Sequence, residues 1–154
     1  MKSIIVFLSV CAFFISYDVT TSGDDPKSTS NQLVGSWRLL TGTLIEKGDT
    51  VVTDYTNNVS FIKIINDNHF AFMHHDLKKG KDSAAVFSSG AGSYSLKDSL
   101  YTEHLEYCSA REWEGHDFTF TINIKNDTLT QSGIEKIDSL GINRLNIERY
   151  VRVK

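Results

Sequence analysis

Glu103 and Arg149 are charged side chains that fall among the apolar positions of two predicted strands, at residues 100–108 and 143–153. Their apolar companions at every second position are Tyr101, Leu105 and Tyr107 in the first strand, and Leu145, Ile147, Val151 and Val153 in the second. Side chains two residues apart in a strand lie on the same face of the sheet. Both charges are therefore predicted to point into the protein, where each must be paired or solvated because burying a lone charge is costly.

Two interpretations of these charges stay open. In the first, Glu103 and Arg149 form an internal ion pair, or Arg149 covers a tryptophan while water solvates Glu103. In the second, they are the polar anchors of a mostly apolar pocket for a ligand with one polar head and an apolar body. The aromatic residues predicted to wall that pocket are Trp37, Phe61, Phe72, Tyr94, Tyr107 and Phe120. For each aromatic residue taken alone, core packing is the commoner explanation.

Other chemistry has less support in the sequence. Adjacent His74 and His75 would point to opposite faces of a strand, and the chain has no His-x-His or Cys-x-x-Cys spacing. The histidines are therefore expected on the surface or in loops, and no metal site is predicted. The chain also has no Gly-x-Ser-x-Gly elbow and no Gly-rich phosphate loop, and Cys108 is expected to be a small core residue. We therefore name no catalytic residue and no cofactor.

The elements that must position these side chains are short strands. At residues 116–125, Phe118, Phe120, Ile122 and Ile124 alternate with polar residues, the pattern of a half-buried strand. Comparable runs predict further strands at 35–46, 58–65, 69–75, 83–88, 91–97, 100–108, 127–135 and 143–153. Turn-forming residues separate them at 66–68, 78–82, 97–99 and 126–127, and a helical turn is expected only near Gln32 and Leu33.

About nine strands in so short a chain must form a sandwich or close into a barrel. Closure removes the exposed strand edges that invite aggregation. We therefore predict an all-β protein with a single antiparallel up-and-down β-barrel of about 8–10 strands.

Short motifs at both ends of this region carry a family resemblance. The first predicted strand opens with Gly35-Ser36-Trp37, and the last contains Arg149-Tyr150-Val151-Arg152. With the runs at 92–96 and 101–107, residues 33–154 resemble the lipocalin-like (calycin) barrels, and in particular small bacterial barrel proteins of unassigned function. The resemblance implies that Gly-x-Trp begins the first strand and that a last-strand arginine covers the tryptophan at the closed end, a contact worth about 0.5–2 kcal/mol.

The chain also departs from the proteins that it resembles. It lacks the disulfide pair of the secreted lipocalins and the Arg-x-Tyr signature of the fatty-acid-binding proteins. No fatty-acid carboxylate site is therefore implied.

The N-terminus predicts export. Lys2 precedes an apolar run at 4–15 that is too short to span a bilayer, so residues 1–22 are interpreted as a signal peptide, 23–32 as a flexible leader and 33–154 as the barrel domain. The expected location is the periplasm, the envelope or the exterior, with no transmembrane span in the mature chain. As an alternative, Cys11 is lipidated as the first mature residue and anchors the protein to a membrane.

The net charge of the chain limits the kinds of partner that it is expected to bind. The chain has 154 residues, 40% of them hydrophobic, and a formal net charge of −3 that does not change when residues 1–22, with Lys2 and Asp18, are removed. Mild acidity argues against nucleic acid or anionic membrane as the partner.

Three functions fit these observations. The first is a non-catalytic exported binding protein for a small hydrophobic or amphipathic molecule. The second is an enzyme on the same barrel that uses an inward Glu103 or a histidine as general acid or base. The third is an envelope protein whose barrel is filled by its own side chains and which acts through its surface. An open interior would favour the first, and a packed interior the third.

Overall fold

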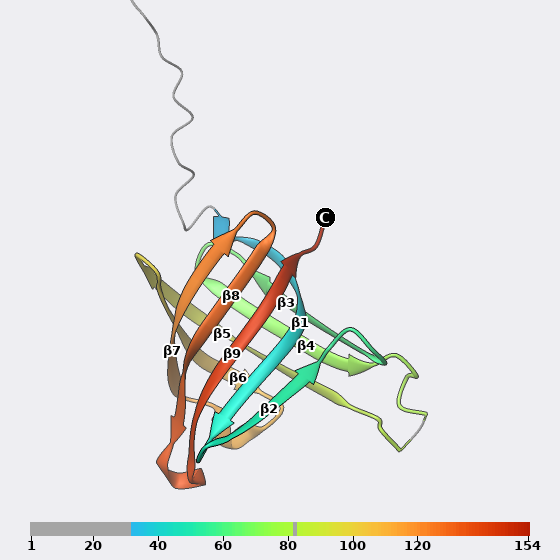
Figure 1. Ribbon diagram of the computed structural model, residues 1–154. Helices are drawn as coiled ribbons and strands as arrows, with labels where there is room; N and C mark the ends of the chain where they lie inside the picture. Colours follow the sequence, from blue (N-terminus) through green and yellow to red (C-terminus); the bar gives the residue numbers. More distant parts are fainter. Residues whose placement is uncertain (1–31, 82) are drawn as a thin grey trace, which may run out of the picture.

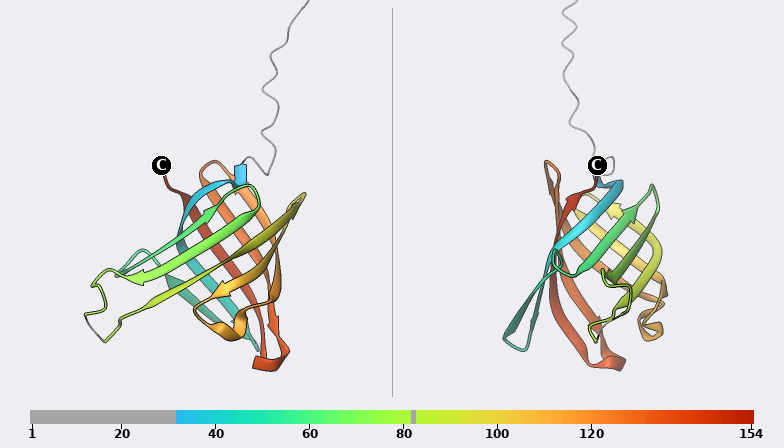
Figure 2. Two further views of the ribbon diagram at one scale, coloured as in Figure 1. Left: turned by 180° about the vertical axis from the view of Figure 1, so that it is seen from behind. Right: turned by 90° about the vertical axis from the view of Figure 1, so that its right-hand side faces the viewer.

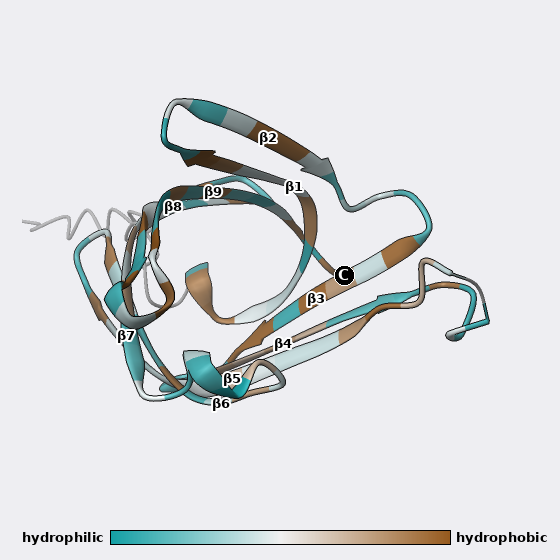
Figure 3. Cartoon of the chain, turned by 90° about the horizontal axis from the view of Figure 1, so that it is seen from below, coloured by the Kyte–Doolittle hydropathy of each residue, from teal (hydrophilic) through white to brown (hydrophobic). Residues whose placement is uncertain are grey.

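The chain forms one antiparallel sheet that curls into a barrel, as seen in a computed structural model that describes residues 32–154 except 82 (Figure 1). The described elements are β1 (Gly35–Glu46), β2 (Asp49–Asp54), β3 (Val59–Ile65), β4 (His69–Asp76), β5 (Phe87–Lys97), β6 (Leu100–Cys108), η1 (Arg111–Trp113), β7 (His116–Lys125), β8 (Thr128–Ile137), η2 (Asp138–Leu140) and β9 (Ile142–Arg152). From β3 to β9 each strand pairs with the next, β1 pairs with both β3 and β9, and β2 lies outside this circle as a hairpin on β1 (Figure 3). These pairings confirm the predicted all-β fold with a single antiparallel up-and-down barrel, which has eight strands in the closed circle.

One predicted strand is wrong, and one strand was not predicted. Residues 83–88 do not form a separate strand, because β5 begins at Phe87 and continues to Lys97. The carboxylate of Asp76 accepts hydrogen bonds from the backbone N–H groups of Gly80 and Val86, which hold residues 77–81 and 83–86 outside the strands. The pattern also missed β2, whose residues are all exposed and therefore show no apolar alternation.

The turns connect these strands as predicted. Tight hairpins join β3 to β4, β5 to β6 and β7 to β8, and residues with positive φ lie in two of them, Asp98 and Asn126. Short polar side chains such as those of Asn and Asp tolerate this conformation better than most. The helical turn expected near Gln32 and Leu33 is also present.

One end of the barrel is closed around Trp37, which is fully buried and donates a hydrogen bond from Nε1 to the Leu33 carbonyl at 2.8 Å. The guanidinium of Arg152 lies over the indole, 4.1 Å from the ring centroid, and donates hydrogen bonds to the carbonyl oxygens of Val34 and Gln32. Gly35 adopts a φ of 144°, and a Cβ there would meet the Arg152 guanidinium, so the Gly-x-Trp motif makes room for this cap.

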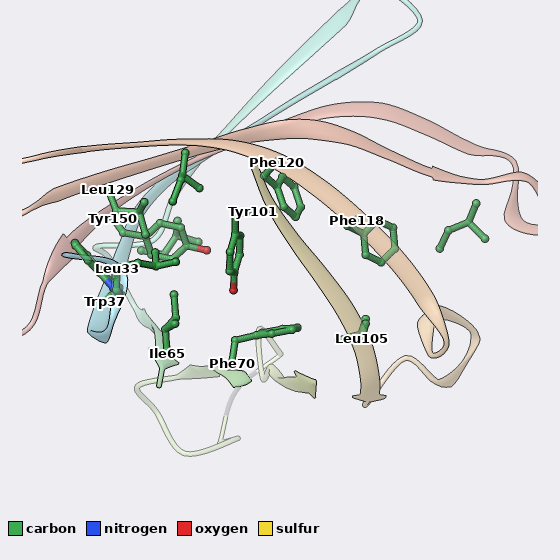
Figure 4. Close-up of a cluster of buried hydrophobic side chains, with 13 residues drawn as sticks. Leu33, Trp37, Ile65, Phe70, Tyr101, Leu105, Phe118, Phe120, Leu129 and Tyr150 are labelled. Atoms are coloured by element: carbon green, nitrogen blue, oxygen red, sulfur yellow. The ribbon is translucent and has the colours of Figure 1, made fainter. Parts of the chain in front are cut away.

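The closed end is filled by large apolar side chains. Figure 4 shows Leu33, Trp37, Ile65, Leu129 and Tyr150 gathered at one end of the barrel, with Leu105 and Phe118 well apart from them toward the other end. All of them are buried.

The barrel is hydrogen-bonded unevenly along its length. Near the closed end, β1 pairs with β3 through residues 35–38, and β7 pairs with β8 through residues 121–125. Toward the other end, residues 41–46 of β1 pair with β2 instead of β3, and residues 116–120 of β7 pair only with β6 among the described strands. This continuous sheet therefore has two parts, β3 to β7 and β8-β9-β1-β2, called the two sheets of the barrel, which are joined at the closed end and diverge toward the open end (Figure 2).

The predicted signal peptide, the possible lipid on Cys11 and all but the last residue of the leader at 23–32 lie outside the described residues. No helix in the part of the chain that the structure describes is long and apolar enough to cross a membrane.

Candidate functional site

A cavity of about 320 Å³ lies inside the barrel on the open side of the closed-end core. Its walls come from both sheets and from the loop that carries η1. The lining residues are Phe61, Lys63, Phe72, Ser88, Glu103, Leu105, Cys108, Ser109, Ala110, Trp113, Phe118, Phe120, Gln131, Glu135, Arg144, Asn146, Glu148 and Tyr150. The barrel is thus filled by its own side chains at one end and hollow toward the other.

One wall of the cavity is aromatic. Phe61 and Phe72, on the adjacent strands β3 and β4, stack with ring centroids 5.5 Å apart and planes inclined by 12°. Across the cavity Trp113, carried by η1, packs against Phe118 with centroids 5.6 Å apart. These rings give the cavity an apolar surface that suits a flat or extended hydrocarbon body.

Lys63 is the buried cation of the interior, with only 2% of its surface exposed. Its ammonium group forms an ion pair with Glu103 and donates a hydrogen bond to Gln131 Oε1 at 3.0 Å. The rings of Tyr101 and Tyr150 lie 5.2 and 5.8 Å from Nζ. A carboxylate, an amide and aromatic faces thus replace the water that the ammonium loses on burial.

A second ion pair lies nearer the open end. Arg144 Nε donates a hydrogen bond to Glu135 Oε2 at 2.7 Å, and Asn146 Nδ2 donates one to Glu135 Oε1, also at 2.7 Å. The guanidinium of Arg144 also lies 5.2 Å from the centroid of the Trp113 ring. Both carboxylate oxygens of Glu135 therefore accept a hydrogen bond. Arg144 also packs on the Trp113 ring at the wall of the cavity.

Glu148 is the third carboxylate of the cavity. Its Oε2 accepts a hydrogen bond of 2.7 Å from the Tyr150 hydroxyl. Burial raises the pKa of Glu148, and the nearby Lys63 charge and the Tyr150 hydrogen bond oppose that rise in part. Burial and the neighbouring Glu148 carboxylate also raise the pKa of Tyr150, so its hydroxyl remains a proton donor. Glu148 is thus a carboxyl group that faces the cavity with a neutral partner.

The structure divides the eight side chains predicted to line a pocket. Phe61, Phe72, Glu103 and Phe120 line the cavity. Trp37 is buried beneath Arg152 at the closed end. Tyr94 also lies at the closed end, where it packs against Tyr101 with ring centroids 5.0 Å apart and donates a hydrogen bond to the Asn66 carbonyl.

The other two predicted lining residues point outward. Arg149 is exposed, because residues 144, 146, 148, 150 and 152 of β9 face the interior, so the predicted inward orientation is wrong. Arg152, three residues on, covers the tryptophan, and Lys63 rather than Arg149 pairs with Glu103.

Tyr107 is 65% exposed, which also contradicts the prediction. The pairing of β5 with β6 jumps from Leu105 opposite Gly92 to Tyr107 opposite Ala91. Glu106 is thus the extra residue of a bulge, which reverses the alternation beyond it, turning Tyr107 outward and Cys108 toward the cavity.

Several polar residues of the site were missed from the sequence, among them Lys63, Gln131, Glu135, Asn146 and Glu148. Lys63 could have been found, because it lies midway between Phe61 and Ile65 and so shares their face of β3. The polar face of β9 gave no such signal. Its apolar residues lie on the outside, where Leu145 pairs with Ile45 of β1 and Ile134 of β8.

The histidines do not form a metal site. No group of three or more histidine, cysteine, aspartate or glutamate side chains in the described part of the chain could hold a metal ion. His75 is exposed as predicted, but His74 is partly buried against the rings of Tyr55 and Phe61, at centroid distances of 5.4 and 5.7 Å. Burial lowers the pKa of His74, with a smaller contribution from His75.

Comparison with known proteins adds little to this geometry. No protein-family model matches the chain, and no curated protein matches it either. A solved structure of a lipocalin-like protein from Bacteroides uniformis is similar, with 15% identity and a TM-score of 0.48, over 79% of this chain and 98% of that one. An uncharacterized protein from Bacteroides eggerthii is similar over 78% of this chain and 98% of its own, with 13% identity and a TM-score of 0.45.

Proposed function

We propose that the protein is a small-molecule binding protein that takes an amphipathic ligand into the open half of its barrel. The observation that carries this proposal is the cavity of about 320 Å³, whose walls combine aromatic rings with hydrogen-bonding side chains. Ligand cavities in proteins commonly have volumes of roughly 300–1,000 Å³ and combine apolar walls with a few polar groups. A small ligand at the lower end of that range fits this site.

The polar groups support an amphipathic ligand over a purely apolar one. Gln131, Asn146 and Glu148 come from the adjacent strands β8 and β9 and line one side of the cavity. An apolar molecule would cover these groups without replacing their contacts with water, which costs free energy. A ligand with one polar group placed against β9 avoids that cost.

Native mass spectrometry of protein purified gently from its own host tests this proposal. We expect a retained small molecule at one copy per chain. Chemical modification of Cys108 then tests whether the molecule is bound in the cavity, because the Cys108 side chain lines it. Alkylation with a bulky maleimide should expel the molecule from the wild-type protein, whereas a Cys108→Ser variant treated in the same way should keep it. Equal retention by the two alkylated proteins would place the ligand outside the cavity.

The Glu148 carboxyl favours a second candidate, an enzyme that uses this group as general acid or base. Burial raises the pKa of Glu148, and its side chain faces the cavity. A carboxyl group with a raised pKa beside a cavity is a common feature of acid–base catalysis. The retained molecule separates the two candidates: a binding protein returns it chemically unchanged after incubation, whereas an enzyme converts it or one of its close analogues.

We also propose that the barrel acts after export, on the basis of the apolar N-terminal run at residues 4–15. The intact mass of the protein from its host gives the mature N-terminus. Loss of about the first 22 residues is expected, whereas a lipid on Cys11 would establish membrane anchoring instead. A full-length chain in the cytoplasm would contradict export.

A further inference from the structure

The charges that line the cavity do not balance. Two cations, Lys63 and Arg144, and three carboxylates, Glu103, Glu135 and Glu148, face the same space. Lys63 is paired with Glu103, and Arg144 with Glu135. If all five groups are ionised, the interior carries one negative charge in excess, and that charge lies on Glu148.

Glu148 receives neutral donors instead of a cation. The Tyr150 hydroxyl donates to it at 2.7 Å, and the neutral amide of Asn146 lies near enough to lower its pKa. Among the described residues Glu148 has no ion pair, although Lys63 lies close enough to act on it electrostatically. Lys63 directs its own hydrogen bonds to Glu103 and Gln131.

The other walls of the cavity also suit a positive charge. Phe61, Phe72, Phe120 and Tyr150 present aromatic rings to the cavity, and aromatic faces attract cations. The site already shows this preference, because Lys63 lies among three rings, and Arg144 lies over Trp113. Both protein cations have their charge neutralised by a carboxylate, so neither opposes a third cation strongly.

We propose that the cavity selects ligands with a cationic nitrogen, such as a primary ammonium group. The cationic nitrogen pairs with Glu148, and the apolar body of the ligand lies against the stacked rings of Phe61 and Phe72. This inference rests on the proposed binding function and adds the charge of the ligand to it. A ligand of this kind gives the interior equal numbers of positive and negative charges. A carboxylate ligand would add a second uncompensated negative charge.

Isothermal titration calorimetry at neutral pH with three probes of one body and different head groups tests the charge preference. The probes are phenethylamine, phenethyl alcohol and hydrocinnamate. We expect phenethylamine to bind at least about tenfold more tightly than the alcohol, and hydrocinnamate to bind most weakly. Glu148→Gln should weaken binding of the amine by about tenfold or more and leave binding of the alcohol nearly unchanged.

Two further variants control for folding and net charge. Glu112→Gln removes the same charge from the exposed turn η1 and should leave the preference intact. Glu148→Asp keeps the carboxylate and should retain the preference even if Glu148→Gln does not fold.

Equal affinity of the wild-type protein for the amine and the alcohol would overturn the charge inference but support the proposed binding function. Binding of none of the three probes would overturn both. If the Glu148→Gln variant still prefers the amine, another group pairs with the ammonium of the ligand, and the proposed role of Glu148 is wrong.

Discussion

At the scale of single residues, Lys63 connects the polar side chains of the barrel interior. Its ammonium group, on β3, joins Glu103 on β6 to Gln131 on β8 across the interior of the barrel, beside aromatic rings. Buried ion pairs of this kind often add little net stability, because both charges lose their water. Removing only one partner is much more costly, since the other charge is then left alone in the interior.

We therefore expect Lys63→Met to lower the free energy of unfolding by about 3–5 kcal/mol, because it leaves Glu103 buried without its cation. The double variant Lys63→Met with Glu103→Leu should recover much of that loss. Urea unfolding followed by circular dichroism measures both effects. Lys97→Met, at an exposed position of β5, serves as the control. A double variant as unstable as the single variant would show that the pair itself stabilises the fold.

Glu148 predicts a pH dependence of stability. Because burial raises the pKa of this group above its ordinary value of 4.5, the folded state binds its proton more tightly than the unfolded state. Ionised Glu148 therefore destabilises the fold above the folded-state pKa. This penalty disappears as the pH falls to the unfolded value. The free energy of unfolding of Glu148→Gln, taken relative to the wild type, should thus rise as the pH increases from the ordinary value of 4.5 to the folded-state pKa of Glu148.

Urea unfolding of the two proteins across that range measures this difference. The subtraction matters because exposed carboxylates such as Asp127 have lowered pKa values, which give stability the opposite pH dependence in both proteins. The charged groups around Glu148 in the cavity are Lys63, Glu103, Glu135 and Arg144, and all are retained in the variant. A flat difference would mean that Glu148 ionises as it would in water.

At the scale of elements, β9 both closes the barrel and lines its cavity. Its interior face carries Arg144, Asn146, Glu148 and Tyr150 along the cavity and Arg152 over Trp37. Arg149, which the apolar pattern had placed inside, is exposed on the opposite face.

These two arginines of β9 form a matched pair for mutation. Arg152→Met should lower the free energy of unfolding by about 1–3 kcal/mol, because it removes the cation over Trp37 and hydrogen bonds to two carbonyl groups. Arg149→Met should change it by less than about 0.5 kcal/mol, as is usual for surface positions. Thermal unfolding followed by tryptophan fluorescence measures both effects. A larger loss at Arg149 would contradict the orientation of β9.

The β1–β2 hairpin should be the least protected part of the sheet. β2 pairs only with β1 and is exposed along its whole length, whereas β8 pairs on one side with β9 and on the other, near the closed end, with β7. In hydrogen exchange followed by mass spectrometry, we expect the amides of residues 50–53 to exchange faster than those of residues 129–132. Equal protection in a concentrated sample would indicate that another surface covers the hairpin.

The sequence predicted most strands because one face of each is apolar. The alternating pattern does not predict a strand correctly where neither face, or the outer face, is the apolar one. β2 has no buried face, and β9 places its polar side chains inside and its apolar ones against neighbouring strands outside. Tyr107 was misplaced by a bulge, which adds one residue and leaves no mark in an alternating pattern. The polar side chains of the site could not be predicted, because their orientation depends on these long-range features. Phe61, Phe72 and Phe120 could be predicted, because they follow the alternating pattern.

At the scale of the whole molecule, the barrel has two unlike halves. The closed half is packed around Trp37 and supplies the core, while the other half leaves a cavity with charged walls. The packed core and the proposed binding cavity therefore lie at opposite ends. This separation explains how a small barrel accommodates five charged side chains around its cavity without giving up a continuous apolar core.

The divergence of the two sheets sets how quickly a ligand exchanges. Within the described residues, the ladders of β1 with β3 and β7 with β8 stop short of the open end. A molecule can enter or leave there without breaking strand pairing, so the barrier is the displacement of side chains such as Trp113 and not the slow opening of a sheet. Side-chain and loop motions take place in about nanoseconds to microseconds. We therefore expect a molecule bound in the cavity to have a short residence time and to equilibrate rapidly with the solvent.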